Sequence, residues 1–441
     1  MSKKKDTLKE KLAKRKYKIP NRFFYWIYHF LMTGFIARKY RPEVTVKDSI
    51  SDCDGSCFLI WNHLSRLDHA FVMQSAYPRP INIVAGYNEF FRSHLHTVFK
   101  LMNIIPKKIY NSDMVSLRGM NSIIRQGGCI AFSPEGMSSI YGHNQPVVPG
   151  TARFIKHYRI PVYFLKLEGS YLTSTKVCLD ERYGKVRGEL RLLFTPEQLD
   201  AMTAEEIDLA INEACRHDDY FWQKEQRIEW KHKYGMCKRL NDICYVCPRC
   251  GGDLTMDVGD DYIKCRECGN GATVNDYYDF VPFDDTCVIP ETPSKWVELE
   301  RARAIDEIRA DREYSLSSEV ILGEIPDHKL IKDFRTTDEC GSGRITIDHE
   351  GIHFRGIKHG ESFDFDLSYE MVFSLPIVTD LQKFGLYVDG EFYEFTPPKP
   401  VVGKMLVVTE EMHRLHVNEW KNFPWFDYLY DGKEMPEKAE T

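Results

Sequence analysis

The sequence has no apolar run long enough to cross a lipid bilayer as a helix. The longest candidate covers residues 23–37, which is 15 positions, and it contains His29. A spanning helix needs about 20 predominantly apolar residues. This segment therefore fits an amphipathic helix lying in a membrane interface better than a transmembrane helix.

An excess of positive charge is also missing. The 441 residues carry a net charge of −6, which argues against general nucleic-acid binding. The first 22 residues differ, because ten lysines and arginines stand there against Asp6 and Glu10, and an aromatic-rich run follows. Basic residues beside aromatic side chains suit an anionic membrane surface. We therefore expect peripheral contact with the inner face of the cell membrane. Packing of this segment on its own domain and a secretory signal peptide stay open as alternatives.

Thirteen cysteines lack the spacing of a disulfide framework. Four of them form two Cys-x2-Cys pairs separated by 14 residues: Cys247, Cys250, Cys265 and Cys268. Four thiolates at this spacing predict a structural Zn²⁺ site with no open coordination position. A redox-active pair is the alternative for either half alone, and Cys244 leaves a shifted choice of ligands open. Reduced cysteines and zinc indicate a cytoplasmic protein.

A histidine and an aspartate five positions apart stand where one apolar run gives way to another. His63 and Asp68 lie between residues 58–61 and residues 70–73. The pattern predicts a strand leading into a helix, with His63 in the turn and Asp68 about one helical turn inside the helix. A carboxylate there can accept the Nδ1 proton and leave Nε2 free to take a proton from a substrate hydroxyl. The pair therefore suggests acyl transfer to an alcohol.

The spacing alone is weak evidence, because His-x4-Asp occurs at two other places. His328 and Asp333 lie in a charged connecting stretch, and His359 and Asp364 lie in alternating β sequence. Neither pair stands where a strand leads into a helix, so we interpret both as solvated surface pairs.

A second motif supports the first. Residues 128–132 predict a short apolar strand, and Ser133-Pro134-Glu135-Gly136 predicts a turn directly after it. Ligands of open α/β sheets bind at the carboxyl edge of the strands. The loops after Trp61 and after Phe132 are therefore expected to meet over one cleft.

Together these blocks resemble the glycerolipid acyltransferase family of the 1-acylglycerol-3-phosphate type. The family shares an Asn-His-x4-Asp motif and a Phe-Pro-Glu-Gly-Thr-Arg-Ser-like motif. Two further family blocks look matched by residues 104–108 (Ile-Ile-Pro-Lys-Lys) and 159–164 (Arg-Ile-Pro-Val-Tyr-Phe). All four occur in the family's order over a domain of roughly 180 residues, which is more specific than any one motif.

The resemblance implies roles for particular residues. His63 would be the general base that activates an acceptor hydroxyl toward an acyl-CoA or acyl-carrier protein thioester, with Asp68 holding its tautomer. The acceptor, a lysophospholipid, would be bound by a set of six residues: Asn62, Arg66, Lys107, Lys108, Glu135 and Gly136.

One departure bears on the acceptor. Ser138 stands where the family commonly has an arginine, and a serine carries no charge to grip a phosphate. Either Lys107, Lys108, Arg66 or Arg153 supplies that charge, or the acceptor is not a lysophospholipid phosphate.

The rest of the chain predicts helices, a ribbon and a β-rich module. We expect helices over residues 199–215, with Thr203 as a plausible N-cap, and over 294–313. Residues 344–348 and 351–355 predict a hairpin, with strands at 362–367, 371–375, 385–388 and 392–395 and a closing helix over 402–417. This order resembles a pleckstrin-homology or GRAM-like barrel at the level of fold.

The expected fold class is α/β: an acyltransferase domain with a mixed sheet flanked by helices, a zinc ribbon, and a β-barrel-like domain capped by a helix. The expected domains are an interface helix (1–40), the acyltransferase domain (41–215), a linker (216–243), the ribbon (244–280), a second linker (281–313), the β domain (314–420) and a tail (421–441).

The leading hypothesis is transfer of a fatty acyl group to 1-acylglycerol-3-phosphate in phospholipid biosynthesis. The first alternative is O-acylation of a different hydroxyl acceptor, which Ser138 suggests. The second alternative is a non-catalytic zinc-ribbon adaptor.

Overall fold

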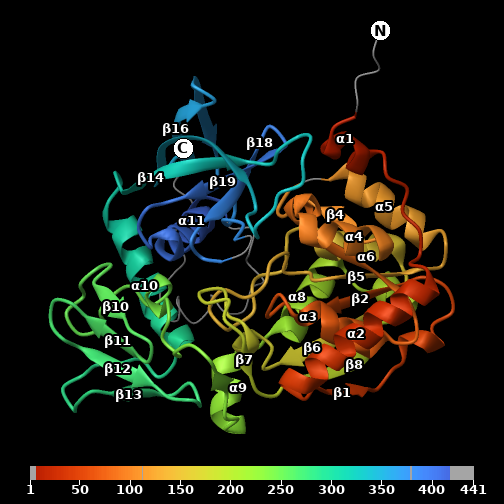
Figure 1. Cartoon of the computed structure of the whole chain (residues 1–441), viewed down its shortest axis with the longest axis horizontal. Helices are drawn as coiled ribbons and strands as arrows, with labels where there is room; N and C mark the ends of the chain where they lie inside the picture. Colours follow the sequence, from red (N-terminus) through yellow and green to blue (C-terminus); the bar gives the residue numbers. More distant parts are fainter. Residues whose placement is uncertain (1–5, 112, 378–379, 418–441) are drawn as a thin grey trace.

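A computed structural model describes residues 6–111, 113–377 and 380–417. The expected tail at 421–441 and the lysines at positions 3–5 lie outside these residues. The described chain forms sheets of seven, four and six strands and a two-stranded pair, β7 (Arg182–Tyr183) with β9 (Lys231–His232). Figure 1 shows the seven-stranded sheet and its helices in red to yellow-green, the four-stranded sheet in green and the six-stranded sheet in blue.

The seven-stranded sheet has the order β1-β8-β6-β2-β5-β3-β4. Its strands are β1 (Glu43–Val46), β2 (Cys57–Trp61), β3 (Ile81–Gly86), β4 (Ile105–Lys107), β5 (Cys129–Phe132), β6 (Val162–Glu168) and β8 (Arg187–Phe194). Neighbouring strands are parallel except β6 and β8, which are antiparallel. The predicted mixed sheet flanked by helices is confirmed.

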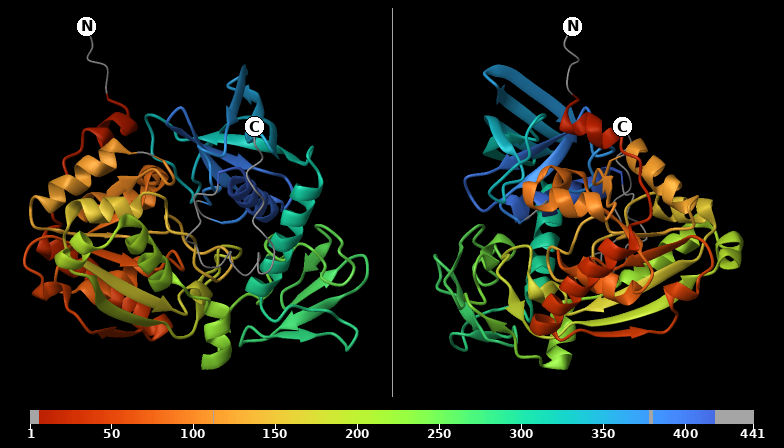
Figure 2. Two further views of the ribbon diagram at one scale, coloured as in Figure 1. Left: turned by 180° about the vertical axis from the view of Figure 1, so that it is seen from behind. Right: turned by 45° about the vertical axis from the view of Figure 1, so that its right-hand side comes forward.

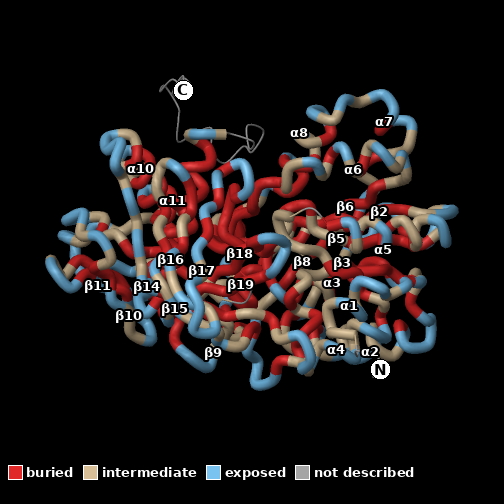
Figure 3. Tube along the Cα trace, turned by 90° about the horizontal axis from the view of Figure 1, so that it is seen from above, coloured by how far each residue is buried: buried red, intermediate tan, exposed pale blue. Residues whose placement is uncertain are grey.

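The central strand β2 is buried on both faces of this sheet. Phe58 and Ile60 belong to one hydrophobic core, and Leu59 and Trp61 belong to the other, because successive side chains of a strand point to opposite faces. The helices α2 and α3 cover one face, and α5, α6 and α8 cover the other (Figure 1). The buried central strands run through the middle of the molecule in Figure 3.

The helices have the following bounds: α1 (Leu8–Ala13), α2 (Arg22–Tyr40), α3 (Asp68–Ala76), α4 (Ser93–Leu101), α5 (Met114–Ile124), α6 (Thr151–Tyr158), α7 (Pro196–Ala201), α8 (Ala204–Cys215), α9 (Asp219–Gln226), α10 (Pro293–Ala310) and α11 (Val402–His416). Short 3₁₀ turns lie at Ile50–Asp52, Tyr87–Phe91, Tyr171–Thr173 and Leu240–Asp242. The single helix expected over residues 199–215 is wrong. Thr203 is the N-cap, as predicted, but its capping box with Glu206 starts a new helix there and divides the segment into α7 and α8.

The N-terminal helix α2 packs on the domain with one side and exposes the other. Tyr25, Ile36 and Tyr40 are buried, and α2 contacts α3. Five large apolar side chains of the same helix are exposed: Phe23, Phe24, Trp26, Phe30 and Leu31. Among the helices of the described residues, none has the length and apolar character required to cross a membrane.

The four-stranded sheet is an antiparallel meander of β10 (Met256–Val258), β11 (Tyr262–Cys265), β12 (Gly271–Val274) and β13 (Phe280–Pro282). Helix α10 follows this ribbon and leads to the six-stranded sheet, as both views in Figure 2 show.

The six-stranded sheet is antiparallel, with the order β17-β16-β15-β14-β19-β18. Its strands are β14 (Ser315–Glu324), β15 (Asp338–Asp348), β16 (Ile352–Lys358), β17 (Glu361–Leu367), β18 (Phe384–Val388) and β19 (Glu391–Thr396). The predicted hairpin is confirmed by the pairing of Ile347 with Ile352. Within the described residues the edge strands β17 and β18 do not pair with each other, so the sheet is a curled half-barrel covered by α11 rather than a closed barrel.

The strand predicted over residues 371–375 is wrong. This segment forms turns in which Val372, Phe373 and Leu375 are buried. The Phe373 ring lies 4.5 Å from that of Tyr110, and Ser374 donates a hydrogen bond to Glu410 of α11. Contacts with other elements, rather than strand pairing, therefore hold this apolar segment.

Candidate active site

The loop between β2 and α3 brings His63 and Asp68 together. His63 Nδ1 lies 2.8 Å from Asp68 Oδ2, the imidazole side chain is 24% exposed and the carboxylate is 1% exposed. Among the described residues no hydrogen bond reaches His63 Nε2. With Nδ1 protonated toward Asp68, Nε2 is the nitrogen that can accept a proton.

Asp68 is the first residue of α3, not one turn inside the helix as predicted. The loop wraps around the carboxylate instead. Oδ2 accepts hydrogen bonds from the backbone N–H groups of Leu64 (2.7 Å) and Ser65 (3.1 Å), and Oδ1 accepts from the hydroxyls of Ser65 (3.3 Å) and Ser170 (2.5 Å). These hydrogen bonds hold the carboxylate against His63 Nδ1, where Asp68 can stabilise a positive charge on the imidazole.

Ser170 reaches Asp68 because another carboxylate holds the turn after β6. Asp219, at the start of α9, accepts hydrogen bonds from the backbone N–H groups of Gly169 (2.6 Å) and Tyr171 (2.8 Å). Sequence reasoning missed Ser65, Ser170 and Asp219. Ser65 lies inside the His63–Asp68 motif and offered a local signal, whereas Ser170 and Asp219 lie over 100 residues away and offered none.

Asn62 fixes the end of β2 to the end of β6. Its Nδ2 donates to the carbonyl of Leu167 (2.8 Å), and its Oδ1 accepts from the Leu167 N–H (2.7 Å). The side chain is fully buried. Asn62, expected to bind substrate, is thus engaged on both sides by the backbone and positions His63 beside it.

The Ser133-Pro134-Glu135-Gly136 turn meets the His63 loop, as the sheet-edge argument predicts. Glu135 Oε2 accepts from the backbone N–H groups of His63 (3.2 Å) and Gln145 (3.4 Å), and the N–H of Ser139 donates to the His63 carbonyl (2.8 Å). Gly136 has φ +76°, and a Cβ there would lie 2.8 Å from Val148 and 3.0 Å from Tyr110. Only glycine fits this close approach without strain.

Glu135 is fully buried, and its Oε1 has no hydrogen-bond partner among the described residues. Burial raises the pKa of this carboxyl well above its ordinary value. Glu135 therefore joins two loops through its hydrogen bonds, and its burial separates it from a substrate hydroxyl in solvent.

The cations expected to bind a phosphate donate to backbone carbonyls. Lys107 Nζ donates to Lys108 (2.7 Å) and Asn111, and burial lowers the pKa of Lys107. Lys108 Nζ donates to Gly390 in the turn between β18 and β19, and Arg66 Nη2 donates to Leu179 (2.8 Å). Ser138 is 5% exposed. Arg153 is exposed on α6. Arg66, Lys107 and Lys108 are thus each engaged by backbone carbonyls.

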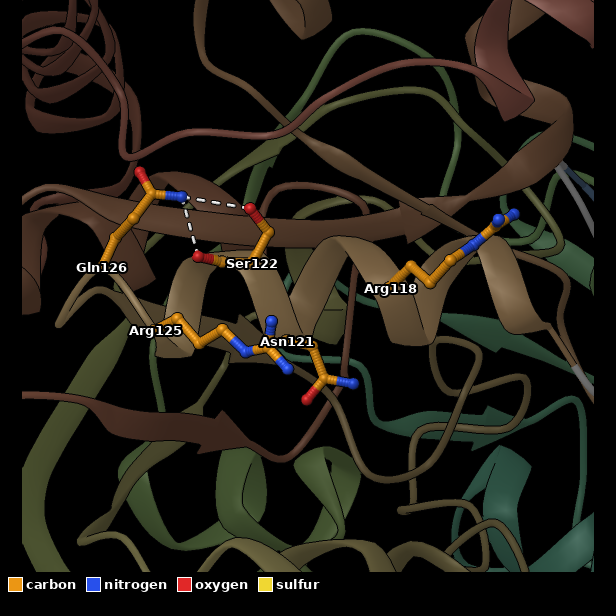
Figure 4. Close-up of a pocket in the computed structure, with 5 residues that line it drawn as sticks. All are labelled: Arg118, Asn121, Ser122, Arg125 and Gln126. Carbon is orange, nitrogen blue, oxygen red and sulfur yellow. Dashed lines mark hydrogen bonds between the residues drawn. The ribbon is translucent and has the colours of Figure 1, made fainter.

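A separate groove lies on α5. It has a volume of ≈ 400 Å³ and is lined by Arg118, Asn121, Ser122, Arg125 and Gln126, with Gln126 hydrogen-bonded to Ser122 (Figure 4). These residues occupy the end of α5 that leads into the start of β5. The groove is thus at the opposite edge of the sheet from His63.

The four ribbon cysteines lie close enough together to hold a metal ion. The Sγ atoms of Cys247, Cys250, Cys265 and Cys268 all lie within 4.8 Å of one another, with Cys247–Cys268 at 3.6 Å and Cys250–Cys265 at 3.8 Å. Tetrahedral Zn–S bonds of about 2.3 Å place sulfur atoms about 3.8 Å apart. The residues therefore fit a Zn²⁺ ion. Cys244 is buried outside the cluster. The alternative in which Cys244 is one of the metal ligands is therefore wrong.

No protein-family model matches the chain, and no curated protein matches it. Among solved structures the chain is similar to the 1-acyl-sn-glycerophosphate (LPA) acyltransferase PlsC from Thermotoga maritima. The TM-score is 0.33 and the sequence identity is 16%, over 44% of this chain and 77% of that chain.

Proposed function

We propose that this protein is an acyltransferase that moves a fatty acyl group from an acyl thioester to an acceptor hydroxyl. The observation that carries the proposal is the 2.8 Å contact of His63 Nδ1 with Asp68, which leaves Nε2 without a partner among the described residues. The dyad lies at the carboxyl end of β2, among the parallel strands of the mixed sheet, where ligands of α/β proteins bind.

The dyad supplies one proton acceptor at the reacting oxygen. His63 Nε2 removes the proton from the acceptor hydroxyl, and the oxygen attacks the thioester carbonyl carbon. The C–O bond forms, the C–S bond breaks, and the imidazolium returns its proton to the departing thiolate. Asp68 stabilises the imidazolium and fixes its tautomer. The acceptor's own oxygen is the nucleophile, so no acyl-enzyme intermediate is required.

The acceptor that we propose is 1-acylglycerol-3-phosphate, with acyl-CoA or acyl-carrier protein as donor, in phospholipid biosynthesis. Support comes from the four ordered blocks between residues 62 and 165, which resemble the glycerolipid acyltransferases.

A different hydroxyl acceptor is the second candidate, and a specific observation favours it. Lys107, Lys108 and Arg66 each donate to backbone carbonyls, and Ser138 replaces the family's arginine. An acceptor without a phosphate would need none of these cations. The adaptor alternative is less favoured, because a non-catalytic protein has no need of the hydrogen bonds that hold Asp68 against His63.

We further propose that α2 lies on an anionic membrane surface at the cytoplasmic face of the cell membrane. Phe30 is 67% exposed and Phe23 is 63% exposed, and exposed aromatic side chains next to basic residues suit a lipid interface. Packing of the segment on its own domain, the alternative, accounts for Tyr25, Ile36 and Tyr40 but not for the exposed side.

The deciding experiment incubates the full chain with palmitoyl-CoA and a panel of acceptors. Thiol release and acylated product are measured with lysophosphatidate, with other lysophospholipids and with phosphate-free alcohols. Product from lysophosphatidate alone supports the leading acceptor, and product only from others selects the second candidate. Absence of product from the whole panel with acyl-CoA and with acyl-carrier protein contradicts the proposed activity.

A further inference from the structure

A small cavity lies where strand β7 meets the ribbon and helix α9. Its volume is ≈ 10 Å³, about the smallest space that holds one water-sized species. Two of its ten lining residues are cationic, Arg182 and Lys238, and none is acidic. Val274 and Tyr278 also line it.

The guanidinium of Arg182 is buried at this cavity without a carboxylate partner. The residue is 3% exposed. It donates from Nη1 to the Tyr278 hydroxyl (2.7 Å) and from Nη2 to the Met236 carbonyl (3.1 Å). In the described part of the chain its Nε has no hydrogen-bond partner, and no Asp or Glu oxygen makes an ion pair with it. Guanidinium stays protonated in proteins, so the charge is present.

Among the described residues no carboxylate lies within ion-pair distance of this charge. The Tyr278 hydroxyl donates its proton to the Leu172 carbonyl (2.9 Å), and burial raises the pKa of Tyr278, so it is a neutral phenol. Lys238 pairs with Asp180 (2.7 Å), which commits that carboxylate to another cation. A buried charge without a counter-charge destabilises the folded state, and an anion beside it offsets that cost.

We propose that the Arg182 cavity binds a single monatomic anion, chloride under physiological conditions. The charge of the lining selects an anion over a cation, and the small volume favours a monatomic ion over phosphate or a carboxylate ligand. The ion joins β7, which precedes β8 of the seven-stranded sheet, to Tyr278 at the edge of the ribbon. This site is independent of the proposed acyl transfer.

The first test compares thermal unfolding of the zinc-loaded full chain in sodium chloride and in sodium isethionate at equal ionic strength. Chloride is expected to raise the melting temperature saturably, since a ligand bound only by the folded state stabilises it. Val274→Ile adds one methylene to the cavity lining and is expected to abolish the difference between the salts. Val281→Ile, at an exposed valine of the same ribbon, is the matched control and should keep it.

The second test is a crystal grown in sodium bromide, with anomalous scattering measured at the bromine edge. The proposal expects a bromide peak in contact with Arg182 in the wild-type chain. A cavity that holds only water, or equal melting temperatures in chloride and isethionate, would overturn the proposal.

Discussion

Ser170 Oγ donates a hydrogen bond of 2.5 Å to Asp68 Oδ1, across 102 residues of sequence. Through this bond the turn after β6 fixes the carboxylate that orients His63. Ser170 therefore acts through Asp68 and is a positioning residue.

Ser170→Ala should lower kcat by about 10- to 100-fold, because a hydrogen bond to a charged group contributes about 1.5–3 kcal/mol. The KM for the acceptor should change little, since Ser170 contacts Asp68 rather than substrate. Steady-state kinetics check this, with Ser170→Thr expected to restore much of the rate. Ser174→Ala removes a weaker 3.4 Å bond to Leu179 and is the matched control.

His63→Gln should reduce acyl transfer by about 10²- to 10⁴-fold, the usual contribution of a general base. The fold should persist, because the side chain is partly exposed and its one hydrogen bond is to Asp68. Product formation and thermal unfolding are measured together. His328→Ala, at an exposed histidine of another His-x4-Asp pair, should leave the rate unchanged. A folded His63→Gln chain with full activity would exclude His63 as the base.

The wild-type chain should lose stability as the pH rises, because Glu135 must ionise while buried. Glu135→Gln should abolish this pH-dependent loss. The folded-state pKa of Glu135 is raised by burial. The contribution of Glu135 to the free energy of unfolding is therefore complete below its unfolded-state pKa near 4.5. This contribution falls as the pH rises toward the folded-state pKa. In denaturant unfolding between pH 4 and pH 8, the free energy of unfolding of the variant should rise relative to that of the wild type as the pH increases. Glu205→Gln, at an exposed glutamate, should show no such trend.

Removal of zinc should unfold the ribbon. A structural zinc site contributes folding free energy directly, so a chelator or Cys268→Ser should lower the melting temperature and release about one zinc ion per chain. Metal analysis and thermal unfolding check this. Cys287→Ser, at a partly exposed cysteine outside the cluster, should retain the ion. Full zinc content in Cys268→Ser would contradict the four-cysteine site.

Binding to anionic vesicles should depend on the exposed side of α2. A chain with Phe23, Trp26 and Phe30 replaced by serine should sediment less with phosphatidylglycerol vesicles, because each loses its apolar contact with lipid. Leu209→Ser, at an exposed leucine of α8, is the control. Removal of residues 1–40 is expected to abolish vesicle binding, and unchanged binding would count against a membrane role for this segment.

The sequence predicted those features whose signals are local. The strand before His63, the turn at Pro134 and the four-cysteine cluster each depend on residues close together in the chain. The capping residue Thr203 was also recognised, although the helix break that it causes was not.

Features set by distant contacts could not be predicted. The strand expected at residues 371–375 has the apolar composition of a strand, but Phe373 packs on Tyr110 instead. Lys108 has the charge expected of a phosphate site, yet its ammonium donates a hydrogen bond to the carbonyl of Gly390, 282 residues away. A single sequence does not show which groups the fold will bring to a lysine.

The contact between Lys108 and the Gly390 carbonyl also bears on biosynthesis. These residues are 282 positions apart, and ribosomes add about 5–20 residues per second. All residues of the seven-stranded sheet are thus synthesised roughly 10 to 40 seconds before Gly390. During that interval Lys108 lacks its carbonyl partner, and synthesis of the C-terminal strands supplies it.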